Sequence, residues 1–75
     1  MTELPTVTAS RLIRALQRDG FFIHHSSGSH RVMKHPDRPE LRVVIPFHVG
    51  DVKRGTLRSI LRQANLTVDE LIALL

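Results

Sequence analysis

Two stretches of the chain carry apolar residues at helical spacing, and they enclose a central region rich in strand formers. In each stretch the apolar residues recur at i, i+3, i+4 and i+7, which places them on one face of an amphipathic helix. The two sets are Ala9, Leu12, Ile13 and Leu16, and Leu57, Ile60, Leu61 and Ala64. Thr8 is suited to cap the first helix and Gly20 to end it. The second helix is expected to begin near Thr56 and to end at Asn65.

The central region is expected to form three antiparallel strands. Residues 21–26, 30–35 and 41–46 are rich in strand formers, and they alternate at least in part between polar and apolar side chains. Residues 26–29, Ser-Ser-Gly-Ser, are typical of a turn. The segment 36–40 contains two prolines, which predicts a second turn in place of a continued strand. A loop over 47–55 then leads to the second long helix. The order is therefore helix, three strands, helix.

A last short helix follows a capping box, Thr67-Val68-Asp69-Glu70. With it the chain reads as an α+β fold, a three-stranded antiparallel sheet with helices packed on one face. The odd positions of the outer strands, together with Met33, should face the helices. His30, Val32 and Lys34 should then share the open face. We expect one domain over residues 1–75, with residues 1–7 as a loose lead-in.

Charge and composition narrow the class of partner. The 75 residues carry eleven Lys and Arg against seven Asp and Glu, a formal charge of +4 that favours a polyanionic or acidic partner. With three Phe and no Tyr or Trp, the chain cannot build a platform that stacks several bases, so contact with RNA would rely on phosphates. The chain has no cysteine and no apolar run near the roughly 20 residues that cross a bilayer, and residues 1–5 lack the charged and apolar regions of a signal peptide. We expect a cytoplasmic protein with no membrane partner.

Five histidines offer three alternatives, which are scattered polar surface residues, a metal site, and general acid–base catalysis. They are His24, His25, His30, His35 and His48. The spacings HxH and HxxxH do not occur and there is no cysteine, so we expect no metal and no other cofactor. Imidazole suits proton transfer because the unperturbed pKa of a histidine is about 6.5.

His30 is the residue best placed for chemistry. It follows Gly28 and Ser29 at a corner where glycine can adopt backbone angles that hold the next side chain open to solvent. Cleavage of RNA requires one group to take the proton of the 2′-hydroxyl and another to protonate the leaving 5′-oxygen. His48 is the first candidate for the second group, and His24 is the next. The candidate phosphate contacts are Arg31, Lys34, Lys53 and Arg54.

These residues carry a resemblance to the HicA family of toxins. It rests on Gly20-Phe21, Gly28-Ser29-His30, His35-Pro36-Asp37, Pro46-Phe47-His48 and above all Gly55-Thr56-Leu57-Arg58-Ser59-Ile60-Leu61-Arg62-Gln63-Ala64. The likeness runs from about Thr8 to Leu75. One departure is Pro36-Asp37-Arg38-Pro39-Glu40, where such proteins often have a shorter Pro-Asp-Gly turn.

The resemblance implies a double-stranded-RNA-binding-domain-like fold, sequential αβββα. It also implies an mRNA interferase that stops translation and is restrained by a HicB antitoxin, with the family's catalytic histidine at His30. The hypothesis is therefore a metal-independent endoribonuclease that cleaves mRNA by histidine general acid–base catalysis. The alternatives are an RNA-binding module without catalysis and a protein that docks an antitoxin without nuclease activity.

Overall fold

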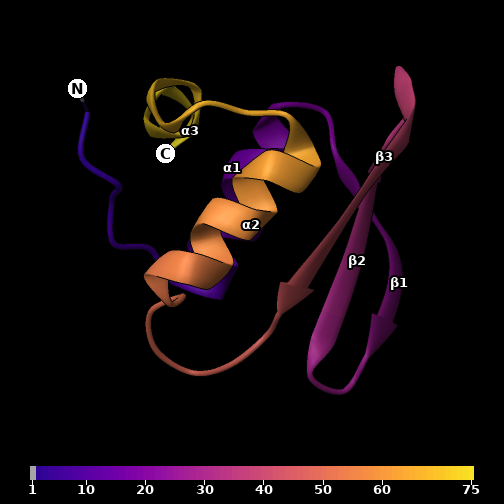
Figure 1. Ribbon diagram of the computed structural model, residues 1–75. Helices are drawn as coiled ribbons and strands as arrows, with labels where there is room; N and C mark the ends of the chain where they lie inside the picture. The colour runs from indigo at the N-terminus through magenta and orange to yellow at the C-terminus, as the bar shows by residue number, and fades with distance from the viewer. Residues whose placement is uncertain (1) are drawn as a thin grey trace.

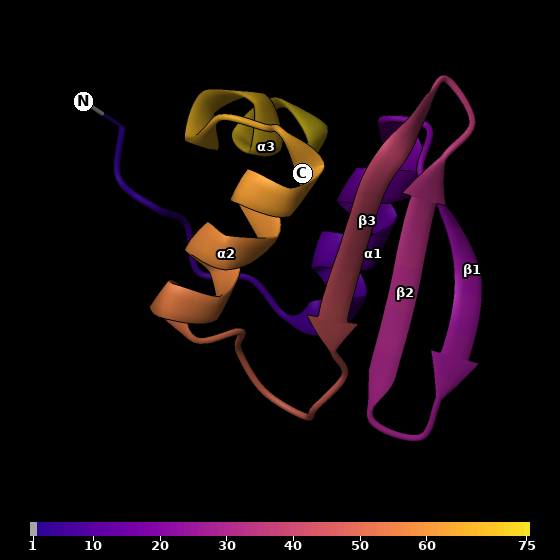
Figure 2. The same cartoon turned by 45° about the vertical axis from the view of Figure 1, so that its right-hand side comes forward.

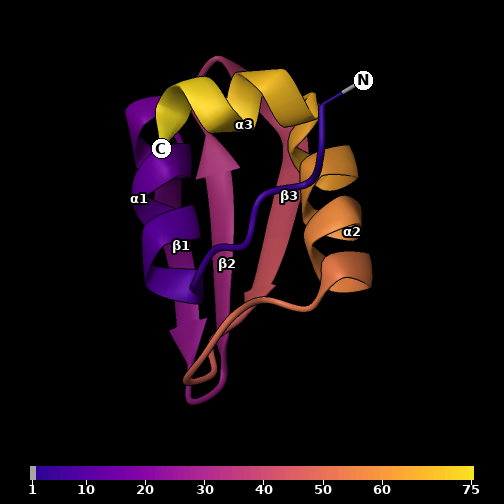
Figure 3. The same ribbon diagram turned by 90° about the vertical axis from the view of Figure 1, so that its left-hand side faces the viewer.

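Three strands form one antiparallel sheet, and the helices cover a single face of it (Figures 1 and 3). The computed structural model describes residues 2–75. The elements are α1 (Ala9–Arg18), β1 (Phe22–Ser27), β2 (His30–His35), β3 (Arg38–Pro46), α2 (Arg54–Ala64) and α3 (Val68–Leu74). The strand order is β1-β2-β3 (Figure 2). This is the α+β architecture expected from the sequence, and its order is compatible with a double-stranded-RNA-binding-domain-like fold.

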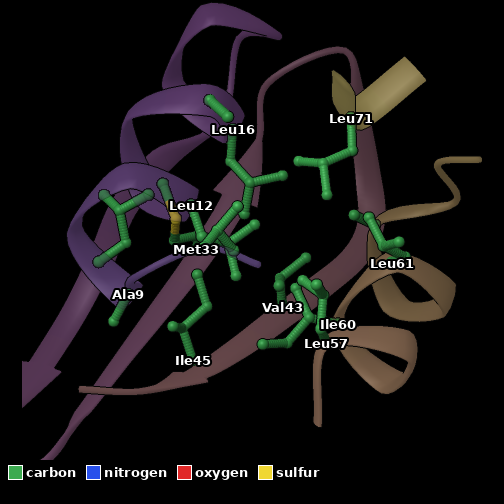
Figure 4. Close-up of a cluster of buried hydrophobic side chains, with 14 of the residues drawn as sticks. Ala9, Leu12, Leu16, Met33, Val43, Ile45, Leu57, Ile60, Leu61 and Leu71 are labelled. Carbon is green, nitrogen blue, oxygen red and sulfur yellow. The ribbon is translucent and has the colours of Figure 1, made fainter. Parts of the chain in front are cut away.

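The core lies between the helices and the inner face of the sheet (Figure 4). Met33, Val43 and Ile45 supply the sheet side and have no exposed surface. The apolar stripes of α1 and α2, together with Leu71 of α3, meet them from the opposite side. Because the stripes repeat at helical spacing, each helix buries one face and leaves its charged residues in water.

The helix ends follow local rules that the sequence contains. The Thr8 side chain accepts a hydrogen bond from the backbone N–H of Arg11 at the start of α1. Asn65 ends α2 in the left-handed conformation, with φ of 57°. Thr67 and Glu70 form the predicted capping box at the start of α3.

The segment before α1 is not the loose lead-in that was expected. Leu4 and Val7 are buried in the core, with 7% and 1% of their surfaces exposed. The N–H of Val52 donates to the carbonyl of Val7 at 2.8 Å, and Thr8 forms an isolated bridge with Asp51. Figure 3 shows this segment crossing between α1 and α2. Its apolar residues do not recur at helical or strand spacing, but Leu4 and Val7 pack into the core and hold the segment in place. The expectation for Met1 lies outside the described residues.

The second turn is shorter than expected, because β3 begins at Arg38. Only Pro36 and Asp37 form the turn, and Arg38 pairs with His35. The prediction that 36–40 is all turn was therefore wrong. Pro39 lacks an N–H, but β3 is an edge strand, where a missing donor leaves no partner unsatisfied. The pairing with β2 is irregular between Met33 and His35, at the same end of the strand.

A buried histidine locks the end of α1 onto the sheet. His35 is 4% exposed, and its Nε2 lies 2.7 Å from the carbonyl oxygen of Asp19. The N–H of Asp37 donates to Nδ1, so the ring carries its proton on Nε2 and donates it to Asp19. The ring of Phe21 meets the imidazole edge-on at 5.0 Å. Gly20 lies against the imidazole, since a Cβ there would be 2.5 Å from Nε2.

We predict that Gly20→Ala lowers the free energy of unfolding by about 1–3 kcal/mol, since its φ is +106° and the new methyl group would displace His35. Gly50→Ala is the matched control. Gly50 also has a positive φ, +94°, but nothing lies within 4 Å of its Cβ position. Urea unfolding of both variants separates backbone strain from the steric conflict. Equal losses would show that the contact with His35 contributes nothing.

Candidate active site on the open face of the sheet

His30 is the first residue of β2 and lies on the face of the sheet that no described helix covers. It pairs with Ser27 of β1 and Pro46 of β3, and its side chain is exposed. Met33, three positions along, faces the helices and is fully buried. Among residues 2–75 the His30 ring has one hydrogen-bond partner, the Ser29 hydroxyl, which lies 3.1 Å from Nδ1. His30 is therefore accessible to a large ligand.

The turn before His30 consists of Gly28 and Ser29 (Figure 2). Its glycine does not have the role that the sequence suggested. Gly28 is not among the glycines with positive φ, and a Cβ there would meet no atom within 4 Å. The backbone at this corner is one that other residues can adopt.

A β-bulge in β1 changes which histidines share the face of His30. Ile23 pairs with Met33, but the next pair is His25 with Val32, so His24 is the extra residue. Strict alternation from Ile23 would turn His25 toward the helices. The bulge reverses this and places His25 on the open face. Sequence reasoning missed His25 as a candidate for this reason.

Ile23 itself differs from expectation in exposure. It shares a face with Met33 of β2, as predicted, yet 41% of its surface is exposed. β1 is an outer strand, and all six of its residues are exposed. Val32 shows the opposite effect: it lies on the open face but is only 7% exposed, because side chains of both neighbouring strands flank it.

The open face is basic. The register and the alternation of β3 place these residues on it: Phe22, His24, His25, Ser27, His30, Val32, Lys34, Arg42, Val44 and Pro46. Three are histidines and two are permanent cations. The one carboxylate in β1–β3 is Glu40, an exposed residue near the turn of Pro36 and Asp37, at the opposite end of the sheet from His30. Lys34 is half-buried opposite Phe22. Such a face attracts a polyanion.

A second basic region lies at the start of α2. The helix begins at Arg54, two residues before the expected start, so Lys53 is its N-cap. The Lys53 side chain makes no capping hydrogen bond, and the first turn has no acidic residue. Both cations are exposed. The first N–H groups of α2 are therefore without a side-chain partner, which suits a phosphate.

His48 lies in the loop between β3 and α2. This loop is near the hairpin, but His48 is not among the open-face residues that include His30. The N–H of Phe47 donates to the carbonyl of Ser29 at 2.6 Å, which ties this loop to the hairpin turn. His48 lines an open hollow of about 410 Å³ together with Lys53 and residues at the starts of both long helices. His30 does not line this hollow. The structure thus brings His48 close to Lys53 and gives no contact between the two histidines.

Arg31 has structural contacts that the sequence did not indicate. Its guanidinium donates to the carbonyl oxygens of Ser27, Gly28 and His30, each at 3.2 Å. It also lies over the Phe47 ring, 4.2 Å from the centroid. These contacts join the hairpin turn to the loop after β3, so Arg31 supports the position of His30.

Similarity to known proteins shows the family to which this chain belongs. A family model described as the HicA toxin of bacterial toxin–antitoxin systems matches residues 9–66. This chain belongs to the HicA family. The match spans the elements from α1 through α2 and includes His30, Lys34, Lys53 and Arg54. A comparison with curated proteins found no match.

Membership of the HicA family makes this protein a toxin of a toxin–antitoxin system, and it implies a HicB-type antitoxin as the partner in that system. Within residues 2–75, no three histidine, aspartate or glutamate side chains gather as metal ligands. None of the helices described is long and apolar enough to cross a membrane.

For this HicA protein we predict that Arg31→Met lowers the free energy of unfolding by about 1 kcal/mol, because it removes three hydrogen bonds and a cation–π contact. Lys34→Met on the same strand is the control, with a change within about 0.5 kcal/mol. Thermal or urea unfolding measures both. An unchanged Arg31→Met protein would show that Arg31 does not brace the hairpin and is free for phosphate.

Proposed function

We propose that this HicA toxin is an endoribonuclease that cleaves mRNA, and so inhibits translation, with His30 as a proton-transfer group. The observation that carries the proposal is the position of His30. Its imidazole is exposed on the uncovered face of the sheet, which also carries Lys34 and Arg42, and the one carboxylate of the three strands, Glu40, lies six residues along β3 from the Pro46 that pairs with His30. A ribose-phosphate backbone can approach that face without displacing any part of the core.

The chemistry requires two proton transfers and stabilisation of charge on the phosphate. The 2′-hydroxyl oxygen attacks phosphorus while a base takes its proton, and the leaving 5′-oxygen receives a proton from an acid. Imidazole can serve either role, and one such transfer contributes about 10²–10⁴-fold. The products are a 2′,3′-cyclic phosphate and a 5′-hydroxyl. The scheme contains no metal-dependent step.

Phosphate contacts are assigned to Lys34 on the open face and to Lys53 and Arg54 at the start of α2. Lys34 lies on the same face and strand as His30, two residues beyond Val32. The second pair is exposed beside backbone N–H groups without side-chain partners. Cations at these two places would bind phosphates of the RNA backbone. Binding of this kind depends on charge and is weakly selective for sequence.

We predict that His30→Ala folds normally but loses RNA cleavage and growth arrest. His30 is exposed and outside the core, so thermal unfolding should be unchanged within the range of ordinary surface substitutions, about 0.5 kcal/mol. Cleavage is measured with purified protein in EDTA, because the proposed reaction uses no metal. The 3′ ends of the fragments are analysed for a 2′,3′-cyclic phosphate or its hydrolysed form.

Three results would contradict this proposal, each in a different way. Full activity in folded His30→Ala removes the histidine mechanism. Loss of wild-type cleavage in EDTA, restored by a divalent cation, points to a metal-dependent nuclease. Salt-dependent RNA binding without cleavage by the wild type supports the binding module instead.

A separate prediction concerns the start of α2. In the His30→Ala background, the double variant Lys53→Gln and Arg54→Gln should reduce the slope of log K against log salt by about 1.4, since each phosphate contact to single-stranded RNA contributes about 0.7. The control exchanges Arg58 and Arg62, two exposed cations further along α2, for glutamine. Fluorescence anisotropy at several salt concentrations measures the slopes. Equal slopes in the two double variants would show that the helix start makes no special contact.

A further inference from the structure

The mechanism proposed above names only one of its two proton-transfer groups, His30. Two proton transfers need two groups, and the sequence alone favoured His48 and then His24 for the second. We propose that His25 is the second proton-transfer group, acting with His30 across the open face of the sheet. The assignment rests on the ribonuclease function proposed above.

The pairing of β1 with β2 carries this assignment. His25 pairs with Val32, and Ser27 pairs with His30. Residues directly opposite in an antiparallel pair share a face, so His25 and His30 both lie on the open face. They are diagonal neighbours, because His30 and Val32 are two residues apart on β2. Both side chains are exposed.

Diagonal spacing fits the reaction. The attacking and leaving oxygens lie on opposite sides of phosphorus, and each must come within about 2.6–3.2 Å of its own proton-transfer group. The two rings must therefore flank the phosphate without touching each other. Diagonal neighbours across a strand pair are about 7–8 Å apart, whereas directly opposite residues are only about 4.5–5.5 Å apart.

The protons and bonds balance with two imidazoles. One imidazole takes the proton of the 2′-hydroxyl as its oxygen bonds to phosphorus. The other begins protonated and gives its proton to the 5′-oxygen as the phosphorus–oxygen bond breaks. No oxidant, reductant or additional reactant is needed.

The other two candidates are less well placed. His24 is the bulged residue, and its ring lies edge-on to Phe22, with centroids 6.5 Å apart, toward the far end of β1 from the hairpin turn. His48 lines the hollow at the starts of the two long helices, and His30 does not. Only His25 combines the face of His30 with a neighbouring position in the register.

The experiment uses an RNA oligonucleotide that contains a bond cleaved by the wild-type protein. It is made in two forms, one with the natural 5′-oxygen and one with sulfur in place of that leaving oxygen. A thiolate leaves without needing a proton, so the loss of the general acid matters little for the sulfur form. The variants are His25→Ala, His25→Gln and His30→Ala, with His24→Ala and His48→Ala to test the two other candidates. The control is Ser26→Ala, next to His25 but on the other face of β1, and thermal unfolding checks each fold.

We expect both His25 variants to lose about 10²–10⁴-fold in kcat on the oxygen substrate with little change in KM, while Ser26→Ala stays within about threefold of wild type. The sulfur substrate should restore activity to one histidine position, 25 or 30, and not to the other. That asymmetry is what a divided acid and base require, and a purely structural role for His25 would not produce it.

Several outcomes would overturn the assignment. Near-wild-type activity of folded His25 variants removes it, as does a loss that appears only in KM. Restoration at both positions or at neither contradicts a divided acid and base. A comparable loss in His24→Ala or His48→Ala, with His25 variants active, transfers the role to that residue. If the wild type itself does not cleave RNA, the ribonuclease function fails first, which distinguishes that result from the others.

Discussion

Burial of a single face of the sheet is the constraint on which the rest of the structure depends. The helices and the N-terminal segment pack on that face, around Met33, Val43 and Ile45, and a chain of 75 residues supplies one such core. The opposite face is left to water. Each strand residue therefore either stabilises the fold or is available to a ligand, and strand alternation decides between the two. His30 and Met33 lie on the same strand, but His30 is exposed on the open face and Met33 is buried in the core.

The elements that the sequence predicts well are those set by local rules. The helical stripes, the Thr8 cap, the left-handed Asn65 and the capping box at Thr67 each depend on residues within a few positions of one another. The start of β3 and the packing of Leu4 depend on distant partners. Pro39 looks like the end of a strand until it is known to lie at an edge of the sheet. Leu4 has no periodic neighbours, and its burial follows only from where α1 and α2 leave space.

The face on which His25 is expected to lie depends on the end of β1 from which the register is counted. Alternation from Phe21 assigns the odd residues of β1 to the helix face. Counting back from the hairpin turn instead pairs Ser27 with His30 and places His25 on the open face, as the structure has it. The two counts disagree by one residue, and a bulge is the only way to satisfy both ends of the strand. Once the hairpin turn is taken to be two residues long, Gly28 and Ser29, the disagreement between the two counts follows from the sequence alone.

A site on the open face is also largely independent of the core. All six residues of β1 are exposed, and on this face Val32 is the residue whose burial is nearly complete. Substitutions at His25 or His30 therefore remove little buried surface, whereas a change at His35 would break a buried hydrogen-bonded contact. His25 and His30 lie on the open face and are available to a ligand. His35 lies on the buried face and is not. The face that each occupies, and not its residue type, determines whether it can take part in chemistry.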